Sequence, residues 1–219
     1  MEYIGYLINL GVTLLIALLV WRYYHRRTAV PAEKYSTFGP RFWTGSIDVC
    51  VLMPITLLTA GLMALDVPRA LAAFLIILQS LAWLIYTVYM HGRYGQTVGK
   101  MVTKVRVVGS RTEEAISWRQ ACIREGIPMI LSMGCLVYEI YAVLTGRLKP
   151  SDVEAGNEMT ANGPYLLLVS LPLLWFLAEV LTMLTNQKRR ALHDLIAGTV
   201  VIRTNTKTIE LGQDSDPAP

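Results

Sequence analysis

Five long apolar runs dominate the 219-residue sequence. They cover residues 3–24, 42–65, 70–90, 122–145 and 164–185. About 20 apolar residues in a helix cross the roughly 30 Å hydrocarbon core of a bilayer. Only 16% of the residues are charged, whereas about 25% are charged in a typical soluble domain. The sequence therefore predicts a membrane protein with five transmembrane helices that contact the lipid bilayer.

The first run is expected to be a retained anchor and not a cleaved signal peptide. Only Glu2 and no basic segment precedes it, and it leads into the basic sequence WRYYHRR (21–27) instead of a small-residue cleavage site. Residues 1–36 are therefore predicted to form a membrane anchor with a basic linker. Residues 37–204 would form the main membrane domain, and residues 205–219 a disordered cytoplasmic tail.

Lysine and arginine alternate between the two ends of the predicted helices. Residues 22–41, 91–124 and 186–219 together hold 17 of these side chains, and the segments at the other end hold three. Basic loops stay in the cytoplasm, so we expect a multi-pass plasma (inner) membrane protein with its N-terminus outside and its C-terminus in the cytoplasm. This topology accounts for the formal charge of +4, and no nucleic-acid partner is expected.

Sites for catalysis or cofactors are not evident. The three cysteines show no CxxC spacing, which argues against a zinc site or a disulfide framework. GRYGQTVGKM (92–101) only superficially resembles a phosphate-binding loop, because Tyr94 and Met101 stand where that loop needs glycine and a hydroxyl residue. We therefore expect no enzyme activity, no cofactor and no bound metal.

The two halves of the chain share a layout. The second and third predicted helices lead into GQTVGKMVTKVRVV (95–108), and the fourth and fifth lead into RRALHDLIAGTVVIR (189–203). Each half is a helical pair, then a basic amphipathic stretch, then a β-branched run. One interpretation is a repeat about an axis along the membrane normal, with the two β-branched runs paired as strands. The alternative is that any hairpin ending in the cytoplasm collects such residues.

The sequence RFWTGSIDVCVL (41–52) places two charges at the head of an apolar run. Arg41 and Asp48 are seven residues apart, so they project from one helix face about 10.5 Å apart along the axis. The side chain of Asp48 is too short to reach the headgroups, and an acid in this position needs a donor or water inside the protein. Asp48 is then either a group that binds and releases protons or cations, or a fixed strut between helices.

Two more acidic residues are candidates for this site. Glu179 lies inside the last apolar run, where an ionisable side chain needs a partner, and one arrangement has it facing Asp48 across the bundle. RRALHDLIAG (189–198) predicts an amphipathic helix at the cytoplasmic interface that ends at Gly198. Asp194 in this helix lies at the depth of Arg41 and is able to pair with it.

The three motifs RFWTGSIDVCVL, GQTVGK…VRVV and RRALHDLIAGTVVI, in this order, resemble the RDD family of bacterial membrane proteins over about residues 37–204. The resemblance implies that Arg41, Asp48 and Asp194 are the arginine and two aspartates that name the family. It implies an all-α membrane protein, with an extra N-terminal span before a four-helix RDD domain with cytoplasmic interfacial amphipathic segments. It also implies a suggested transport role, since some members are thought to exchange monovalent cations for protons.

Two functions stay open at this point. In the first, the protein is a transporter or a transporter subunit, in which Asp48 titrates and Arg41, Asp194 and Glu179 complete a path that faces the cytoplasm. Five spans make a thin scaffold, so this function favours a homo-oligomer. In the second, the protein is a membrane scaffold or assembly protein whose charges are structural and whose segment 91–121 docks a membrane-protein partner.

Overall fold

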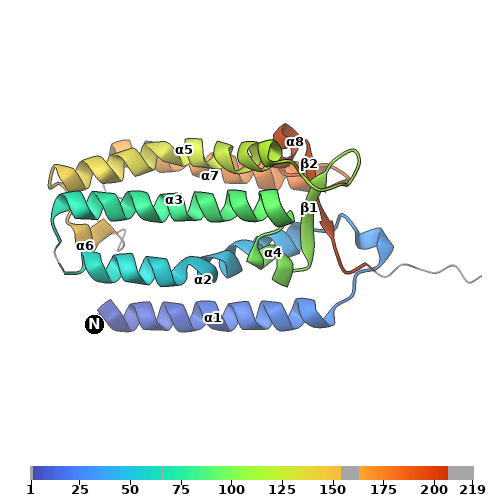
Figure 1. The fold of residues 1–219 in the computed structure, drawn as a ribbon, viewed down its shortest axis with the longest axis horizontal. Helices are drawn as coiled ribbons and strands as arrows, with labels where there is room; N and C mark the ends of the chain where they lie inside the picture. Colours follow the sequence, from blue (N-terminus) through green and yellow to red (C-terminus); the bar gives the residue numbers. More distant parts are fainter. Residues whose placement is uncertain (1, 66, 154–162, 207–219) are drawn as a thin grey trace, which may run out of the picture.

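The computed structural model describes residues 2–65, 67–153 and 163–206, and five long helices run alongside one another in it (Figure 1). They are α1 (Glu2–Arg26), α2 (Phe38–Met63), α3 (Arg69–Tyr94), α5 (Trp118–Leu144) and α7 (Gly163–Thr185). Within the described residues, α2, α3, α5 and α7 are long and apolar enough to cross a membrane. A membrane-spanning role for α1, which packs beside α2, stays a prediction. Of the tail predicted to be disordered, residues 205–219, Asn205 donates to the Arg27 carbonyl at 2.6 Å and Thr206 bridges to Ala29, and the part from residue 207 lies outside the described residues.

The short elements gather mainly at one end of the bundle (Figure 1). This end, which we call the capped end, carries α4 (Val98–Val102), β1 (Val105–Gly109), α8 (Leu192–Ala197) and β2 (Thr199–Arg203), with a 3₁₀ turn at Pro31–Glu33. Only α6 (Pro150–Val153) lies at the opposite end among the described short elements. The three basic segments of the chain all lead to the capped end, which is the side that the charge count predicts to be cytoplasmic.

The helices extend beyond the apolar runs by about one turn at the capped end. The helix α2 begins at Phe38, α3 continues to Tyr94, and α5 begins at Trp118. Capping residues set two of these limits. Gly95 ends α3 in the left-handed region at φ 68°, and the Ser117 side chain caps α5 by accepting from the Gln120 amide at 3.3 Å. Hydropathy marks the part of each helix suited to lipid, whereas caps decide where it ends.

The two β-branched runs pair as antiparallel strands, in register from Val105 opposite Arg203 to Gly109 opposite Thr199. The valines of both strands are buried, and on one face of the ribbon they pack with residues at the start of α5. This cluster comprises Val105, Val107, Ile116, Ala121 and Val201. The sequence predicted an all-α protein. The described chain is mostly helical but also contains this pair of strands. Extended backbone occurs here because alternate β-branched side chains have an apolar surface to cover.

The shared layout of the two halves is present in the structure. The helices α3 and α7 begin at residues 69 and 163, α4 and α8 at 98 and 192, and the two strands at 105 and 199. Each pair is separated by 94 residues. Moreover, α2 packs against α3 and α4 in the way that α5 packs against α7 and α8. Residues 38–203 thus form two successive units that share two long helices, a short helix and a strand, while α6 is additional in the second unit and α1 precedes both.

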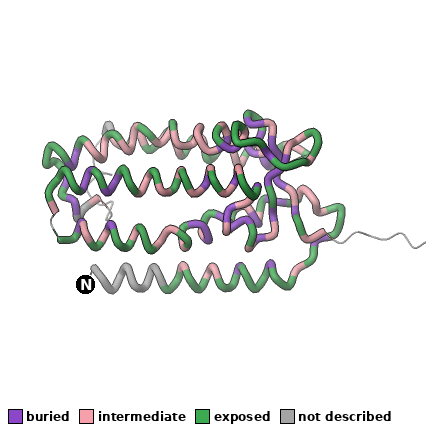
Figure 2. The backbone as a smooth tube through the Cα atoms, viewed as in Figure 1, coloured by how far each residue is buried: buried purple, intermediate pink, exposed green. Residues whose placement is uncertain are grey.

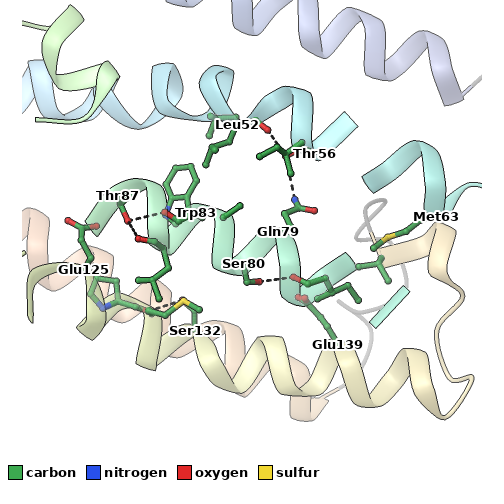
Figure 3. Close-up of a pocket in the computed structure, with 18 residues that line it drawn as sticks. Leu52, Thr56, Met63, Gln79, Ser80, Trp83, Thr87, Glu125, Ser132 and Glu139 are labelled. Carbon is green, nitrogen blue, oxygen red and sulfur yellow. Dashed lines mark hydrogen bonds between the residues drawn. The ribbon is translucent and has the colours of Figure 1, made fainter. Parts of the chain in front are cut away.

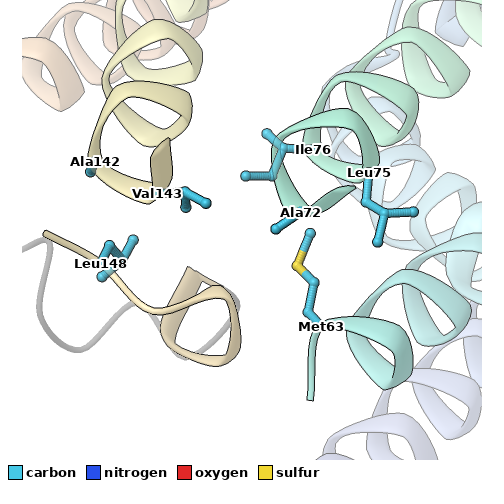
Figure 4. Close-up of a cluster of buried hydrophobic side chains, with 7 residues drawn as sticks. All are labelled: Met63, Ala72, Leu75, Ile76, Ala142, Val143 and Leu148. Atoms are coloured by element: carbon cyan, nitrogen blue, oxygen red, sulfur yellow. The ribbon is translucent and has the colours of Figure 1, made fainter. Parts of the chain in front are cut away.

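Buried residues concentrate toward the ends of the bundle (Figure 2). At the end opposite the cap, an apolar cluster joins α2, α3 and α5 (Figure 4): Met63, Ala72, Leu75, Ile76, Ala142, Val143 and Leu148. The buried charged side chains belong to the capped end. Between the ends, the long helices expose many large apolar side chains, which is the surface expected of helices in contact with lipid.

The crossing of α3 and α5 depends on a glycine. A Cβ atom at Gly92 would lie within 2.5 Å of Cζ3 in the Trp118 ring, so an alanine requires the ring or the helix to move. We expect Gly92→Ala to lower the free energy of unfolding by about 1–3 kcal/mol, the usual cost of overpacking. Thermal unfolding in detergent measures this. Gly126→Ala is the control, because nothing lies within 4 Å of a Cβ there. Equal melting temperatures for both variants would contradict the tight crossing.

Candidate functional site

Asp48 is 4% exposed and accepts three hydrogen bonds, all from α3 and the start of α4. The Tyr86 hydroxyl and the Gly99 amide each donate to Oδ1 at 2.7 Å, and the Thr97 hydroxyl donates to Oδ2 at 2.7 Å. Tyr86 and Thr97 also accept from the amides of Val98 and Lys100. The first N–H groups of a helix have no partner within it. Asp48 and its two hydroxyl partners therefore satisfy the buried start of α4.

Close contact between α2 and α4 requires the glycine at position 99. A Cβ atom there would lie 2.9 Å from Asp48 Oδ1 and closer still to the carbonyl oxygen of Thr44. The Thr44 hydroxyl is also 3.0 Å from the Thr103 hydroxyl at the other end of α4. One face of α2 thus holds α4 along its whole length, which fixes the position of β1 after it.

Asp194 is completely buried and accepts four hydrogen bonds. Arg41 Nη2 and Arg124 Nη1 form ion pairs with its two oxygens. The Thr199 hydroxyl donates to it at 2.9 Å and the Ala191 amide at 3.0 Å. These donors come from α2, α5, β2 and the turn before α8. Burial alone would raise the pKa of Asp194, but the charges of Arg124 and Arg41 outweigh it and hold the pKa well below its usual value.

His193 joins this cluster to α7. Its Nδ1 pairs with Glu179, and Arg41 Nη2 lies 3.2 Å from its Nε2. An arginine only donates, so Nε2 must accept and the proton of a neutral ring sits on Nδ1, facing the carboxylate. Burial and the nearby Arg124 lower the pKa of His193, which agrees with a neutral ring at pH 7.

The network continues from Arg124 into α3. Glu125 Oε1 lies 3.3 Å from Arg124 Nε and 3.1 Å from His91 Nδ1. His91 is 1% exposed, and its Nε2 has no hydrogen-bond partner among the described residues. Charged and polar contacts therefore run without a break from Glu179 through the two arginines to His91. They link all four helices that are long and apolar enough to cross a membrane.

A cavity of about 650 Å³ extends from this network between α2, α3 and α5 (Figure 3). Glu125 lines it near the capped end and Glu139 lines it further along α5. Fourteen residues of helix separate the two carboxylates by about 21 Å. The middle is lined by polar groups from each helix: Thr56, Gln79, Ser80 and Ser132. The Thr59 hydroxyl donates to Gln79 Oε1 at 3.0 Å, and the Tyr165 hydroxyl donates to Glu139 at 3.5 Å.

The residues expected to form the site fall into two groups. Arg41, Asp194 and Glu179 belong to one network, and the contact between Arg41 and Asp194 is present. Asp48 lies apart with its own donors, and Glu179 meets His193 instead of Asp48. Neither group lines the cavity.

The sequence analysis missed Arg124, Glu125, Glu139 and His91. Arg124 was counted only as a basic topology marker. Glu125 and Glu139 are acids within an apolar run, the signal that drew attention to Glu179. Their separation of 14 residues, close to four helical turns, also places them on nearly the same face.

No group of three or more potential metal-ligating side chains occurs within the described ranges. The polar groups of the cavity come from helix positions far apart along the axis, so they form a lined path and not a compact ligand set.

This geometry defines a class of protein: a multi-pass membrane protein with a buried charge network over one end of a helical bundle. The family model of the RDD family matches residues 35–198, which is most of the chain. The chain belongs to the RDD family. The match leaves α1 outside it, and no curated protein and no solved structure matches the chain.

Loss of the Asp194 charge should be costly, because it leaves two buried arginines without their common partner. We expect Asp194→Asn to reduce the free energy of unfolding by about 3–5 kcal/mol, the usual cost of breaking a buried ion pair. Thermal unfolding in detergent measures the loss, and the exposed Glu114→Gln is the matched control. A shift no larger than that of the control would remove the network from its structural role.

The stability of the fold should vary with pH in a specific way. The pKa of Asp194 in the folded chain is depressed. Its contribution is therefore complete above the unfolded pKa of about 3.9 and is lost as pH falls below it. We expect Asp194 to add no pH dependence to the melting temperature between pH 8 and 5. A decline in that range that Asp194→Asn abolishes would contradict this assignment.

Proposed function

We propose that this RDD-family protein exchanges monovalent cations for protons along the cavity between α2, α3 and α5. The observation that carries the proposal is a pair of carboxylates, Glu125 and Glu139, that line one largely apolar cavity with hydroxyl and amide groups between them. The two carboxylates span about 21 Å of a hydrocarbon core about 30 Å thick. Ionisable groups inside a membrane are costly, and they usually mark a path for ions or protons.

The size and lining of the cavity suit small hydrated cations. A water molecule takes about 30 Å³ in the liquid, so about 650 Å³ accommodates a cation with part of its hydration shell. Hydroxyl and amide oxygens between the glutamates are suitable replacements for the remaining water. Anionic substrates fit less well, because the two charged side chains that line the cavity are both acids.

This proposal moves the transport role away from Asp48. Both oxygens of Asp48 are engaged by three donors at 2.7 Å, and the residue does not line the cavity. Asp48 and Asp194 instead hold the elements of the capped end in place. Structural roles for the charges that name the family are thus compatible with transport elsewhere in the bundle.

The scaffold alternative has less support. The first part of its proposed docking segment, residues 91–121, is used inside the chain, since α4 packs on α2 and the valines of β1 are buried, whereas most of residues 111–119 are exposed. Homo-oligomer formation stays a prediction.

Cation-dependent proton flux in proteoliposomes tests the proposal. With a sodium or potassium gradient and a pH-sensitive dye inside, we expect flux from the unmodified chain and at least a tenfold loss in Glu125→Gln and Glu139→Gln. Removing either charge takes away the attraction for a cation at that end of the path. Glu114→Gln, on the exposed surface, is the control and should retain full flux. Unchanged flux in both cavity variants would exclude this path.

A further inference from the structure

Lys100 is a largely buried cation at the capped end that forms none of the ion pairs of the Asp194 network. It lies in the middle of α4 and is 9% exposed. Its backbone amide bonds to the Thr97 hydroxyl. Within the described parts of the chain, however, its ammonium makes no hydrogen bond and has no carboxylate within 4.0 Å. A largely buried lysine without a direct counterion loses its proton more readily than an exposed one.

Charged groups surround Lys100 at a greater distance. Arg41 and Asp48 face it from α2, and Arg124 and Glu125 face it from α5. His91 on α3 senses its charge as well. On the side of α1, the neighbouring Val102 packs against Val20 and Tyr24. The group is thus enclosed by two cations and two anions, with no dedicated counterion.

Glu125 is distinguished from the other neighbours by its access to the cavity. Asp48 has donors on both of its oxygens, Arg41 pairs with Asp194, and Arg124 pairs with Asp194 and Glu125. Glu125 is 19% exposed and lines the cavity. A cation that arrives at this carboxylate therefore adds positive charge close to Lys100, which a neutral amine tolerates better than an ammonium.

We propose that Lys100 is the proton-exchanging group of the cavity, so that binding of one monovalent cation at Glu125 releases one proton from the Lys100 ammonium. This inference rests on the proposed function. The N–H bond of the ammonium breaks, the electron pair stays on the amine nitrogen, and the proton leaves to water at the capped end. Release of the cation reverses the step, and the total charge of the site is unchanged.

The protonation properties of Lys100 agree with this role. Burial, followed by the charge of Arg124, lowers the pKa of Lys100 from 10.5 to about 8. The ammonium then dominates at pH 7, and the cost of deprotonation is small. Asp194 is a poorer candidate because its two arginines hold its pKa well below the usual value.

Cation binding to the purified full chain tests the proposal. If protons and cations compete through a pKa of about 8, sodium should bind about fifty-fold more tightly at pH 8 than at pH 6. The binding of radioactive sodium in detergent measures this ratio. In Lys100→Met we expect binding to persist with a ratio below about threefold. Arg111→Met, which removes an exposed charge, should keep the ratio of the unmodified chain.

Proton release gives a second readout. In weakly buffered solution at pH 7.5, saturating sodium should release about three quarters of a proton per site from the unmodified chain, the fraction of Lys100 protonated there, and none from Lys100→Met or Lys100→Gln. If both variants showed the same ratio of sodium affinities and the same proton release as the unmodified chain, the role of Lys100 would be overturned. The proposed function would remain intact. Absence of any sodium binding sensitive to Glu125→Gln would overturn both proposals.

The stability of the fold checks Lys100 without any ligand. The folded pKa of about 8 is below the unfolded 10.5, so the unfolded chain binds more protons between these values and stability rises with pH there. We expect the melting temperature of the unmodified chain, relative to that of Lys100→Met, to increase from pH 8 to pH 10. A constant difference would show that Lys100 does not titrate in this range and would overturn its role.

Discussion

The arrangement of the capped end depends on one buried carboxylate, Asp194, held between Arg41 and Arg124. These two arginines belong to helices from different repeat units; Arg41 pairs with Asp194, and Arg124 pairs with Asp194 and also with Glu125 on its own helix. Each arginine would be costly to bury alone, and so would the aspartate. Only the three together, with the Thr199 hydroxyl and the Ala191 amide, make the burial acceptable. This interaction joins the first unit to the second.

In each repeat unit a charged side chain of a long helix holds the following short helix, but the two charges are of opposite sign. In the first, an acid on the long helix, Asp48, satisfies the start of the short helix α4. In the second, a base on the long helix, Arg124, binds an acid in the short helix α8. Lys100 stands 94 residues before Asp194, at the equivalent position in α4. The first unit, however, gives Lys100 no counterion, and this asymmetry between related positions is what makes Lys100 available for other chemistry.

Much of the architecture could be predicted from the sequence. Apolar length gave the long helices, and the β-branched runs VRVV and TVVI indicated the strand pair, because both signals are local. The end of α8 at Gly198, where φ is 67°, followed from the preference of glycine for that conformation. The first turns of α2 and α5 could not be predicted from hydropathy, since they depend on capping groups and on polar contacts with other elements.

The site was harder to predict, since partners of buried charges are chosen in three dimensions. The pairing of Arg41 with Asp194 could be anticipated from their similar depth. The partner of Glu179 could not, because His193 reaches it only through the turn that brings α8 back against α7. The cavity depends on the spacing of α2 and α5 across α3, which no motif in either helix records.

The antiparallel ribbon of β1 and β2 has a mechanical consequence. It ties the two units together by backbone hydrogen bonds at the capped end, and an apolar cluster around Met63 and Val143 joins them at the opposite end of the bundle. Any relative motion of the two units would have to break directional hydrogen bonds at the capped end, whereas at the opposite end it would displace apolar side chains around Met63 and Val143. Glu125 and Lys100 lie toward the capped end, and Glu139 lies further along α5 toward the apolar end, so such a motion would displace Glu139 more than the other two.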